Sequence, residues 1–153
     1  MLIAAMMLLA AGTPDTPALD LKLRCDGVGT FPEAQSTFAS VHGSNGYASG
    51  SATTVGRGQI RDRVLVEVSG ETARIRLPRA LVPAINSGGR DGWWELTKIT
   101  MGEAEIGGQF RLNPFNKPTV RIDRTTGSIE VQGSFQLSFR GECEIADPAE
   151  RRF

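Results

Sequence analysis

Few residues in this chain have the type and spacing that catalysis needs. His42 is the only histidine, so a Ser–His–Asp triad or a zinc site built from several imidazoles would depend on it. It lies in the run Ser40-Val41-His42-Gly43-Ser44, and no Gly-x-Ser-x-Gly motif occurs. The sequence therefore indicates a loop histidine.

The glycines and carboxylates add no catalytic pattern. Gly43 to Ser51 is rich in glycine but has no following lysine, so it does not match a phosphate-binding loop. The spacing of the carboxylates selects no pair for glycoside chemistry; those considered are Asp91, Glu95, Glu103, Glu105 and Asp123. The sequence predicts no catalytic residue, no metal ligand and no cofactor. An enzyme, such as a hydrolase of the cell envelope without a recognisable signature, stays open as the alternative.

The dipeptide Trp93-Trp94 offers the clearest candidate for ligand binding. In a strand, one ring points into the core and the other points outward, where it can offer a flat platform to a sugar or a lipid. Residues 87–95 would then form a binding loop, with Arg90, Asp91, Trp93 and Trp94 as candidate ligand-binding residues. The alternative is that both rings only cover the core.

Arginine outnumbers lysine by 14 to 3, and several arginines fall on the polar side of expected strands. These are Arg24, Arg74, Arg76, Arg111, Arg121 and Arg140. On neighbouring strands they would form a stripe able to bind phosphate or carboxylate groups. The alternative is cross-strand pairing with Glu67, Glu130 and Glu142. With 17 basic and 17 acidic residues, the zero net charge argues against nucleic acid or an anionic membrane as a partner.

The elements that would position these residues are mostly strands. Apolar and polar residues alternate with period two in six segments, at 21–26, 64–68, 73–77, 120–123, 129–132 and 135–140, with weaker candidates at 93–99 and 103–112. Ser69-Gly70 and residues 123–127 have the composition of hairpin turns. Pro83 limits the only helical candidate, at 79–85, to one or two turns. Residues 31–59 show no clear pattern, and within them residues 43–58 are compatible with either a twisted strand or a mobile loop.

The order of strands and the two cysteines predict the fold class. Strands in series with short links indicate an all-β fold, a small antiparallel barrel or sandwich with at most one short helix, and a barrel is slightly favoured. Cys25 lies in the first expected strand and Cys143 in the last, so a disulfide would join them. Two separate buried thiols are the alternative. We expect a single β domain at 21–146, a flexible leader at 13–20 and a C-terminal tail at 147–153.

The amino terminus is typical of an export signal. Residues 1–11 are all apolar, and Ala10-Ala11-Gly12 supplies small residues for cleavage, although no basic residue precedes the run. About 16 Å of helix is too short to cross a bilayer, so no transmembrane segment is expected. We expect a signal peptide at 1–12 and a periplasmic or secreted protein. A buried N-terminal helix is the alternative.

The second half of the chain resembles uncharacterised exported proteins of proteobacteria. The segments that carry the resemblance are IRLP (75–78), INSGGRDGWWEL (85–96), RLNPFNKP (111–118), RIDRTTGSIEV (121–131) and FRGECE (139–144). The resemblance implies export and a disulfide but no activity or site. We therefore expect a non-catalytic exported binding or interaction domain, whose partner is an unknown small molecule or an envelope protein. Its oligomeric state stays open.

Overall fold

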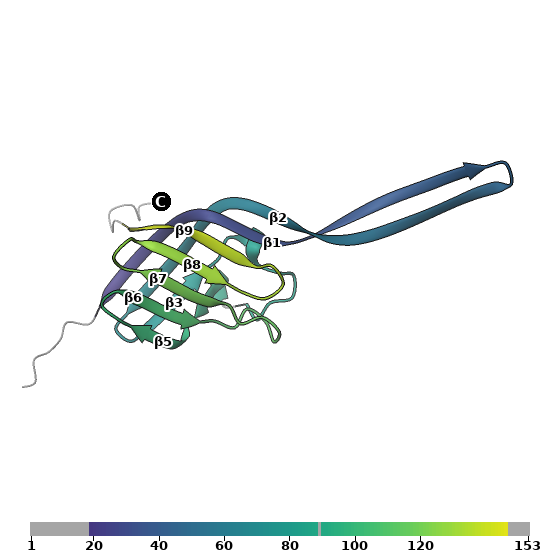
Figure 1. Cartoon of the computed structure of the whole chain (residues 1–153). Coiled ribbons are helices and arrows are strands. Elements are labelled where there is room, and N and C mark those ends of the chain that lie inside the picture. Colours follow the sequence, from purple (N-terminus) through teal and green to yellow (C-terminus); the bar gives the residue numbers. More distant parts are fainter. Residues whose placement is uncertain (1–18, 89, 147–153) are drawn as a thin grey trace, which may run out of the picture.

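The computed structural model describes residues 19–88 and 90–146, which form one antiparallel sheet with a long hairpin projecting from it (Figure 1). The elements of this part are β1 (Asp20–Gly43), β2 (Gly46–Ser69), β3 (Thr72–Arg76), β4 (Trp93–Glu95), β5 (Thr97–Met101), β6 (Glu105–Gln109), β7 (Thr119–Asp123), β8 (Ser128–Gln132) and β9 (Ser138–Ile145), with the 3-10 turns η1 (Arg79–Leu81) and η2 (Arg90–Gly92). The expected all-β class is confirmed. The expected signal peptide and C-terminal tail lie outside the described residues, as does most of the expected leader.

The sheet is open, so the preference for a closed barrel was wrong. Its strand order is β4-β3-β2-β1-β9-β8-β7-β6-β5, and the two edge strands do not pair with each other. β4 and β5 nevertheless follow one another along the chain, with only Leu96 between them. The sheet therefore folds over on itself as a sandwich, and β1 to β3 lie across the layer formed by β5 to β9 (Figure 1).

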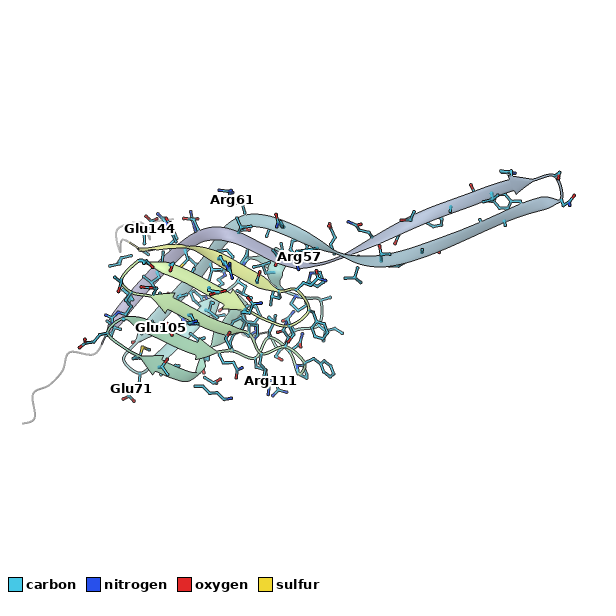
Figure 2. The ribbon with its side chains drawn as sticks, in the orientation of Figure 1. Arg57, Arg61, Glu71, Glu105, Arg111 and Glu144 are labelled. Atoms are coloured by element: carbon cyan, nitrogen blue, oxygen red, sulfur yellow. A yellow bond between two sulfur atoms is a disulfide. The ribbon has the colours of Figure 1, made fainter. Side chains whose placement is uncertain are left out.

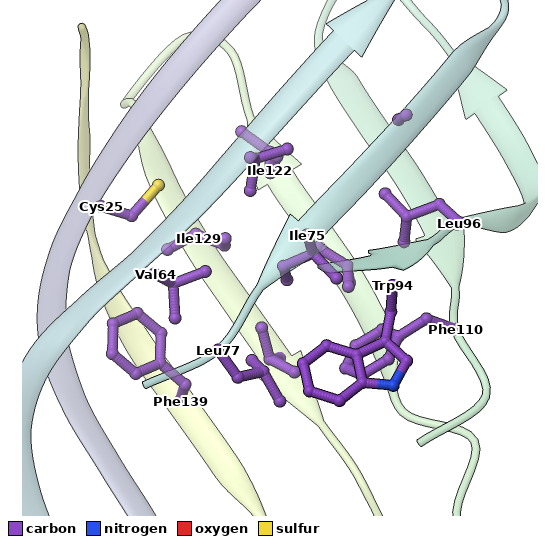
Figure 3. Packing of buried hydrophobic residues seen from close by; sticks show 14 of the residues in the cluster. Cys25, Val64, Ile75, Leu77, Trp94, Leu96, Phe110, Ile122, Ile129 and Phe139 are labelled. Carbon is purple, nitrogen blue, oxygen red and sulfur yellow. The ribbon is translucent and has the colours of Figure 1, made fainter. Parts of the chain in front are cut away.

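The core lies between the two layers and is built by the alternation that the sequence shows. In β2, Val64, Val66 and Val68 are buried while the residues between them face outward. Their side chains meet those of the opposite layer, among them Ile129 and Phe139 (Figure 3). Burying a side chain of this size contributes about 1.5 to 3 kcal/mol, which makes this layer contact the main stabilising term.

The first and last strands are neighbours, as the cysteine positions predicted. Cys25 and Cys143 are directly opposite in the β1–β9 register and form a disulfide. Two residues along, Gly27 faces Gly141, and a Cβ on Gly27 would lie 2.1 Å from the carbonyl oxygen of Arg140. The strands approach so closely here that only glycine fits.

Two local predictions need correction. The strand expected at 135–140 begins only at Ser138, because Phe135 and Gln136 have left-handed φ angles of 55° and 63° and form a turn. The helix expected at 79–85 is reduced to η1, since Pro83 stands just after its end.

The glycine-rich region that the sequence left open is strand. β1 and β2 pair without interruption from Asp20↔Ser69 to Gly43↔Gly46. β1 pairs with β9 only up to Thr30, and β2 pairs with β3 only from Leu65 onward. The outer part of the hairpin therefore projects beyond the rest of the sheet (Figure 1).

Candidate interaction surface

The outer part of the hairpin, residues 32–57, is here called the β-arm. All of its residues are exposed except Gly56, which is half-buried. Twelve residues of each strand at about 3.3 Å per residue give it a length of about 40 Å. The β-arm ends in a tight turn, Ser44-Asn45, which is flanked by Gly43 and Gly46.

The edges of the β-arm are unprotected. Exposed strand edges in monomeric proteins are normally blunted by lysines, prolines, bulges or a covering segment. Here the register with the partner strand has no shift, and the only proline is Pro32 at the base. Only Glu33 and Arg57 carry a charge. In the part of the chain that the structure describes, no strand pairs with either edge of the β-arm, so both edges offer free backbone donors and acceptors over its whole length.

The base of the β-arm is held in place by specific contacts. The ring of Phe31 covers Gly58 on the opposite strand, where a Cβ would lie 2.6 Å from ring atoms. The Thr30 hydroxyl donates to the Gln136 carbonyl at 2.8 Å, and Arg57 Nε donates to the Gln136 side-chain oxygen at 3.5 Å. Arg57 marks this junction in Figure 2. These contacts fix the direction in which the β-arm leaves the sandwich.

An apolar groove of about 400 Å³ lies at this base and is here called the root groove. It is lined by Phe31, Pro32, Ala80, Leu81, Val82, Pro83, Ala84, Leu112, Asn113, Asn116, Ser134, Phe135 and Leu137. Phe135 is 66% exposed, and Phe115, which donates its backbone N–H to Asn113, is 82% exposed. Large exposed rings beside an apolar groove are typical of a contact surface.

Asn116 holds the loops around the root groove together. Its side chain is buried, accepts from the N–H of Ser134 at 2.9 Å and donates to the Ser134 carbonyl at 3.3 Å. Because both ends of the amide are used, its burial carries no unpaired polar group. The root groove is therefore formed by loops of defined conformation.

The four predicted ligand-binding residues are neighbours in the chain, and alternation separates the two rings as expected. Trp94 is buried and packs near Phe110 with ring centroids 6.1 Å apart, whereas Trp93 is half-exposed. The guanidinium of Arg74 covers the Trp93 ring at 4.6 Å. Arg90 and Asp91 lie in η2 just before β4, where the exposed Asp91 has a left-handed φ of 64°. A ligand role for Arg90, Asp91, Trp93 and Trp94 stays a prediction, with the outer ring already partnered by an arginine.

Several arginines of the expected stripe pair with carboxylates on neighbouring strands. Arg74 donates to Glu67 at 2.5 Å, Arg121 to Glu105 at 2.8 Å and Arg140 to Glu130 at 2.8 Å. Arg24 pairs with Glu144. Across β6 to β9 the signs alternate from strand to strand, which favours cross-strand pairing over an anion-binding stripe. The hydrogen bond from Arg121 lowers the pKa of Glu105 below its ordinary value.

The residues with catalytic potential are not brought together. His42 lies at the tip of the β-arm, opposite Tyr47, with the two ring centroids 4.9 Å apart. Within the described ranges it has no serine or aspartate partner, and no group of three His, Cys, Asp or Glu side chains there could hold a metal ion. No helix in that part is long and apolar enough to cross a membrane.

Comparison with family models, with curated proteins and with solved structures gave no match to this chain. We therefore infer the function from the geometry of the β-arm and the root groove. Sequence reasoning missed this surface, although Asn45-Gly46 between two runs of small and β-branched residues is a hairpin signal.

Proposed function

We propose that this chain is a non-catalytic binding domain of the periplasm or the extracellular medium. It engages another macromolecule through the β-arm and the root groove. The observation that carries the proposal is the β-arm itself, a ribbon about 40 Å long whose two edges and two faces are not covered by any residue of 19–88 and 90–146.

The β-arm has little structural reason to exist in an isolated domain. A two-stranded hairpin is marginally stable in water, because backbone hydrogen bonds contribute little net free energy without side-chain burial. Ordering its residues costs about 1 to 2 kcal/mol each in backbone entropy. A segment of this kind gains stability when a partner covers it.

The chemistry of the β-arm fits a protein surface. Free strand edges bind extended segments by adding a strand, and exposed rings at the root groove supply apolar anchors. The nearly uncharged β-arm offers no patch for phosphate groups, and the arginines on β7 and β9 are occupied by carboxylates. Nucleic acid and anionic lipid are accordingly poor partners.

Export is supported by the disulfide. The Cys25–Cys143 bond requires an oxidising compartment to form and persist, which the cytoplasm normally does not offer. The apolar run at 1–12 is the export signal in this proposal, and the resemblance to exported proteobacterial proteins agrees with it.

Site-specific photocrosslinking in intact cells tests the proposal. A benzophenone amino acid replaces Phe38 in the β-arm or Phe115 beside the root groove, and the matched control position is Glu71 in the exposed turn between β2 and β3. We expect crosslinked products from Phe38 and Phe115 and none from Glu71. Products from Glu71 alone would contradict the assignment of the surface.

A further inference from the structure

The two faces of the β-arm differ in side-chain size. Residues that are opposite one another in an antiparallel pair point to the same side of the ribbon. One face carries the pairs Phe38↔Ser51, His42↔Tyr47 and Ala34↔Val55; it is here called the aromatic face. The other face carries Val41↔Ala48, Ala39↔Gly50 and Thr37↔Ala52, which are mostly small.

The aromatic face has a symmetric pattern about its centre. Counting four residues from the Phe38↔Ser51 pair reaches His42↔Tyr47 toward the tip and Ala34↔Val55 toward the base. The pairs between them are polar on both sides, Ser40↔Ser49 and Ser36↔Thr53. Read from either end, pairs that contain an aromatic or an aliphatic side chain alternate with pairs of hydroxyl residues.

We propose that two copies of this chain pack their aromatic faces together with the two β-arms antiparallel. This inference rests on the proposed function and names its partner as a second copy. A two-fold axis across the ribbon then passes at Phe38, so that β1 lies over β1 and β2 over β2. Phe38 meets Phe38 of the second copy, and about 13 Å to either side Tyr47 meets Val55 of the second copy.

The sizes of the facing side chains are complementary. The large Tyr47 ring lies against the smaller Val55, and His42 lies against Ala34. The serines of one copy face the Ser36↔Thr53 pair of the other, so hydroxyl groups face hydroxyl groups. The opposite face has no such symmetry. Its largest aliphatic residue, Val41, lies near the tip, and a two-fold axis at Ala39 would place it against Thr37, whereas one at Thr37 would place it against Glu33.

The area of such a contact is that of a weak, reversible dimer. A ribbon of two strands is about 10 Å wide, so one face of the β-arm offers about 400 Å² per copy. The total of about 800 Å² lies below the size of stable interfaces and in the range of transient ones. The tip of one β-arm then lies over Pro32 of the other copy, at the end of the ribbon.

Symmetry and charge favour a second copy over a different protein. An isologous contact closes after two subunits, whereas packing the aromatic face on the opposite face would continue into a filament. Zero net charge and a nearly uncharged β-arm remove electrostatic repulsion between identical chains. The modest area points to reversible association in the micromolar range.

Sedimentation equilibrium of the full oxidised chain, from about 5 to 500 µM, tests the inference. Phe38→Ser removes the central contact, and Val41→Ser is the matched control on the opposite face of the same strand. Both side chains are largely exposed, at 84% and 67%, so neither substitution disturbs the core. We expect the dissociation constant to rise at least tenfold for Phe38→Ser and less than threefold for Val41→Ser.

A cysteine at the axis provides an independent readout. Phe38→Cys places two thiols opposite each other across the two-fold axis, about 10 Å apart at the backbone. A bis-maleimide with a short spacer should therefore link two chains, whereas Val41→Cys should stay monomeric. A wild-type protein that is monomeric at 500 µM overturns the inference, as does an equal loss of affinity in Phe38→Ser and Val41→Ser.

The two proposals fail in different ways. If the chain stays monomeric but Phe38 crosslinks to a different macromolecule in cells, the dimer is wrong and the proposed function stands. If the chain is monomeric and the β-arm yields no crosslink, both proposals fail. A crosslinked product with twice the mass of the chain supports both.

Discussion

β1 and β2 each have one half in the sandwich and one half in the β-arm, and the side chains of the two halves differ in burial. In the sandwich half, Val64, Val66 and Val68 are at most 1% exposed beneath the opposite layer. In the β-arm, Val55 lies on the same strand and is 65% exposed. Backbone pairing is equally regular in both halves, so what differs is only the presence of a second layer.

The comparison shows that strand pairing and stability are separate properties. The sandwich half is stabilised by burial of apolar side chains. In the β-arm, the register of the two strands is set by their pairing in the sandwich, which continues into the β-arm without a shift. Substitutions in the sandwich should therefore change the free energy of unfolding, and matched substitutions in the β-arm should not.

Loss of the disulfide should have the largest effect. The bond joins residues 118 apart in sequence, and the chain-entropy model assigns about 4 to 5 kcal/mol to a loop of this size. We expect the Cys25→Ala, Cys143→Ala double variant to lose stability of this order in guanidinium unfolding followed by tryptophan fluorescence. Wild-type protein unfolded under reducing conditions is the control. An unchanged midpoint in both samples would show that the core alone holds β1 against β9.

Truncation of a buried aromatic side chain should cause the second-largest loss of stability. Phe139 is 1% exposed between the layers, so Phe139→Ala should cost about 3 to 5 kcal/mol through lost burial and the cavity left behind. Phe38→Ala removes the same atoms in the β-arm and should change the stability by less than about 0.5 kcal/mol at 1 µM protein, below the expected dimer range. A large loss in Phe38→Ala would mean that the β-arm belongs to the cooperative core.

Alanine substitutions at two glycines, one in the sandwich and one in the β-arm, should differ in their effect on the free energy of unfolding by less than the substitutions above. A Cβ on Gly27 meets backbone atoms of β9, whereas one on Gly50 in the β-arm meets nothing within 4 Å. Gly27→Ala should destabilise the chain by about 2 to 3 kcal/mol, because the clash is with backbone. Gly50→Ala should be neutral in the same denaturant titration. Equal effects would show that β1 and β9 can separate without cost.

The sandwich could be predicted from the sequence because burial leaves a periodic pattern. Alternation located the strands around Val66, Ile75 and Ile129. The positions of Cys25 and Cys143 predicted that the first and last strands, β1 and β9, are neighbours. The turn at Phe135-Gln136 could not be predicted, because neither residue normally adopts a left-handed φ and the alternation continues through them. The sheet is open because β4 and β5 do not pair with each other, and no local sequence pattern encodes whether two edge strands pair.

Apart from the turn signal at Asn45-Gly46, the sequence of the β-arm does not distinguish strands from a loop. No layer of the described residues covers it, so it shows no alternation of buried apolar and exposed polar positions, and small residues such as Ala48 and Gly50 are equally common in loops. The candidate site at Trp93 was found through residue type alone. Its neighbour Arg74 is distant in sequence, so the covering of that ring depends on strand pairing and could not be seen beforehand.

Shortening the β-arm should have the smallest effect on stability. Replacing residues 35–54 by Asn-Gly joins Ala34 to Val55, which are already opposite each other, through a two-residue hairpin turn. The removed residues bury no core side chain, so the free energy of unfolding should change by no more than about 1 kcal/mol, while self-association is lost. A loss above about 2 kcal/mol at 1 µM protein would contradict the separation of the two halves, because it would show that the β-arm stabilises the sandwich without any partner.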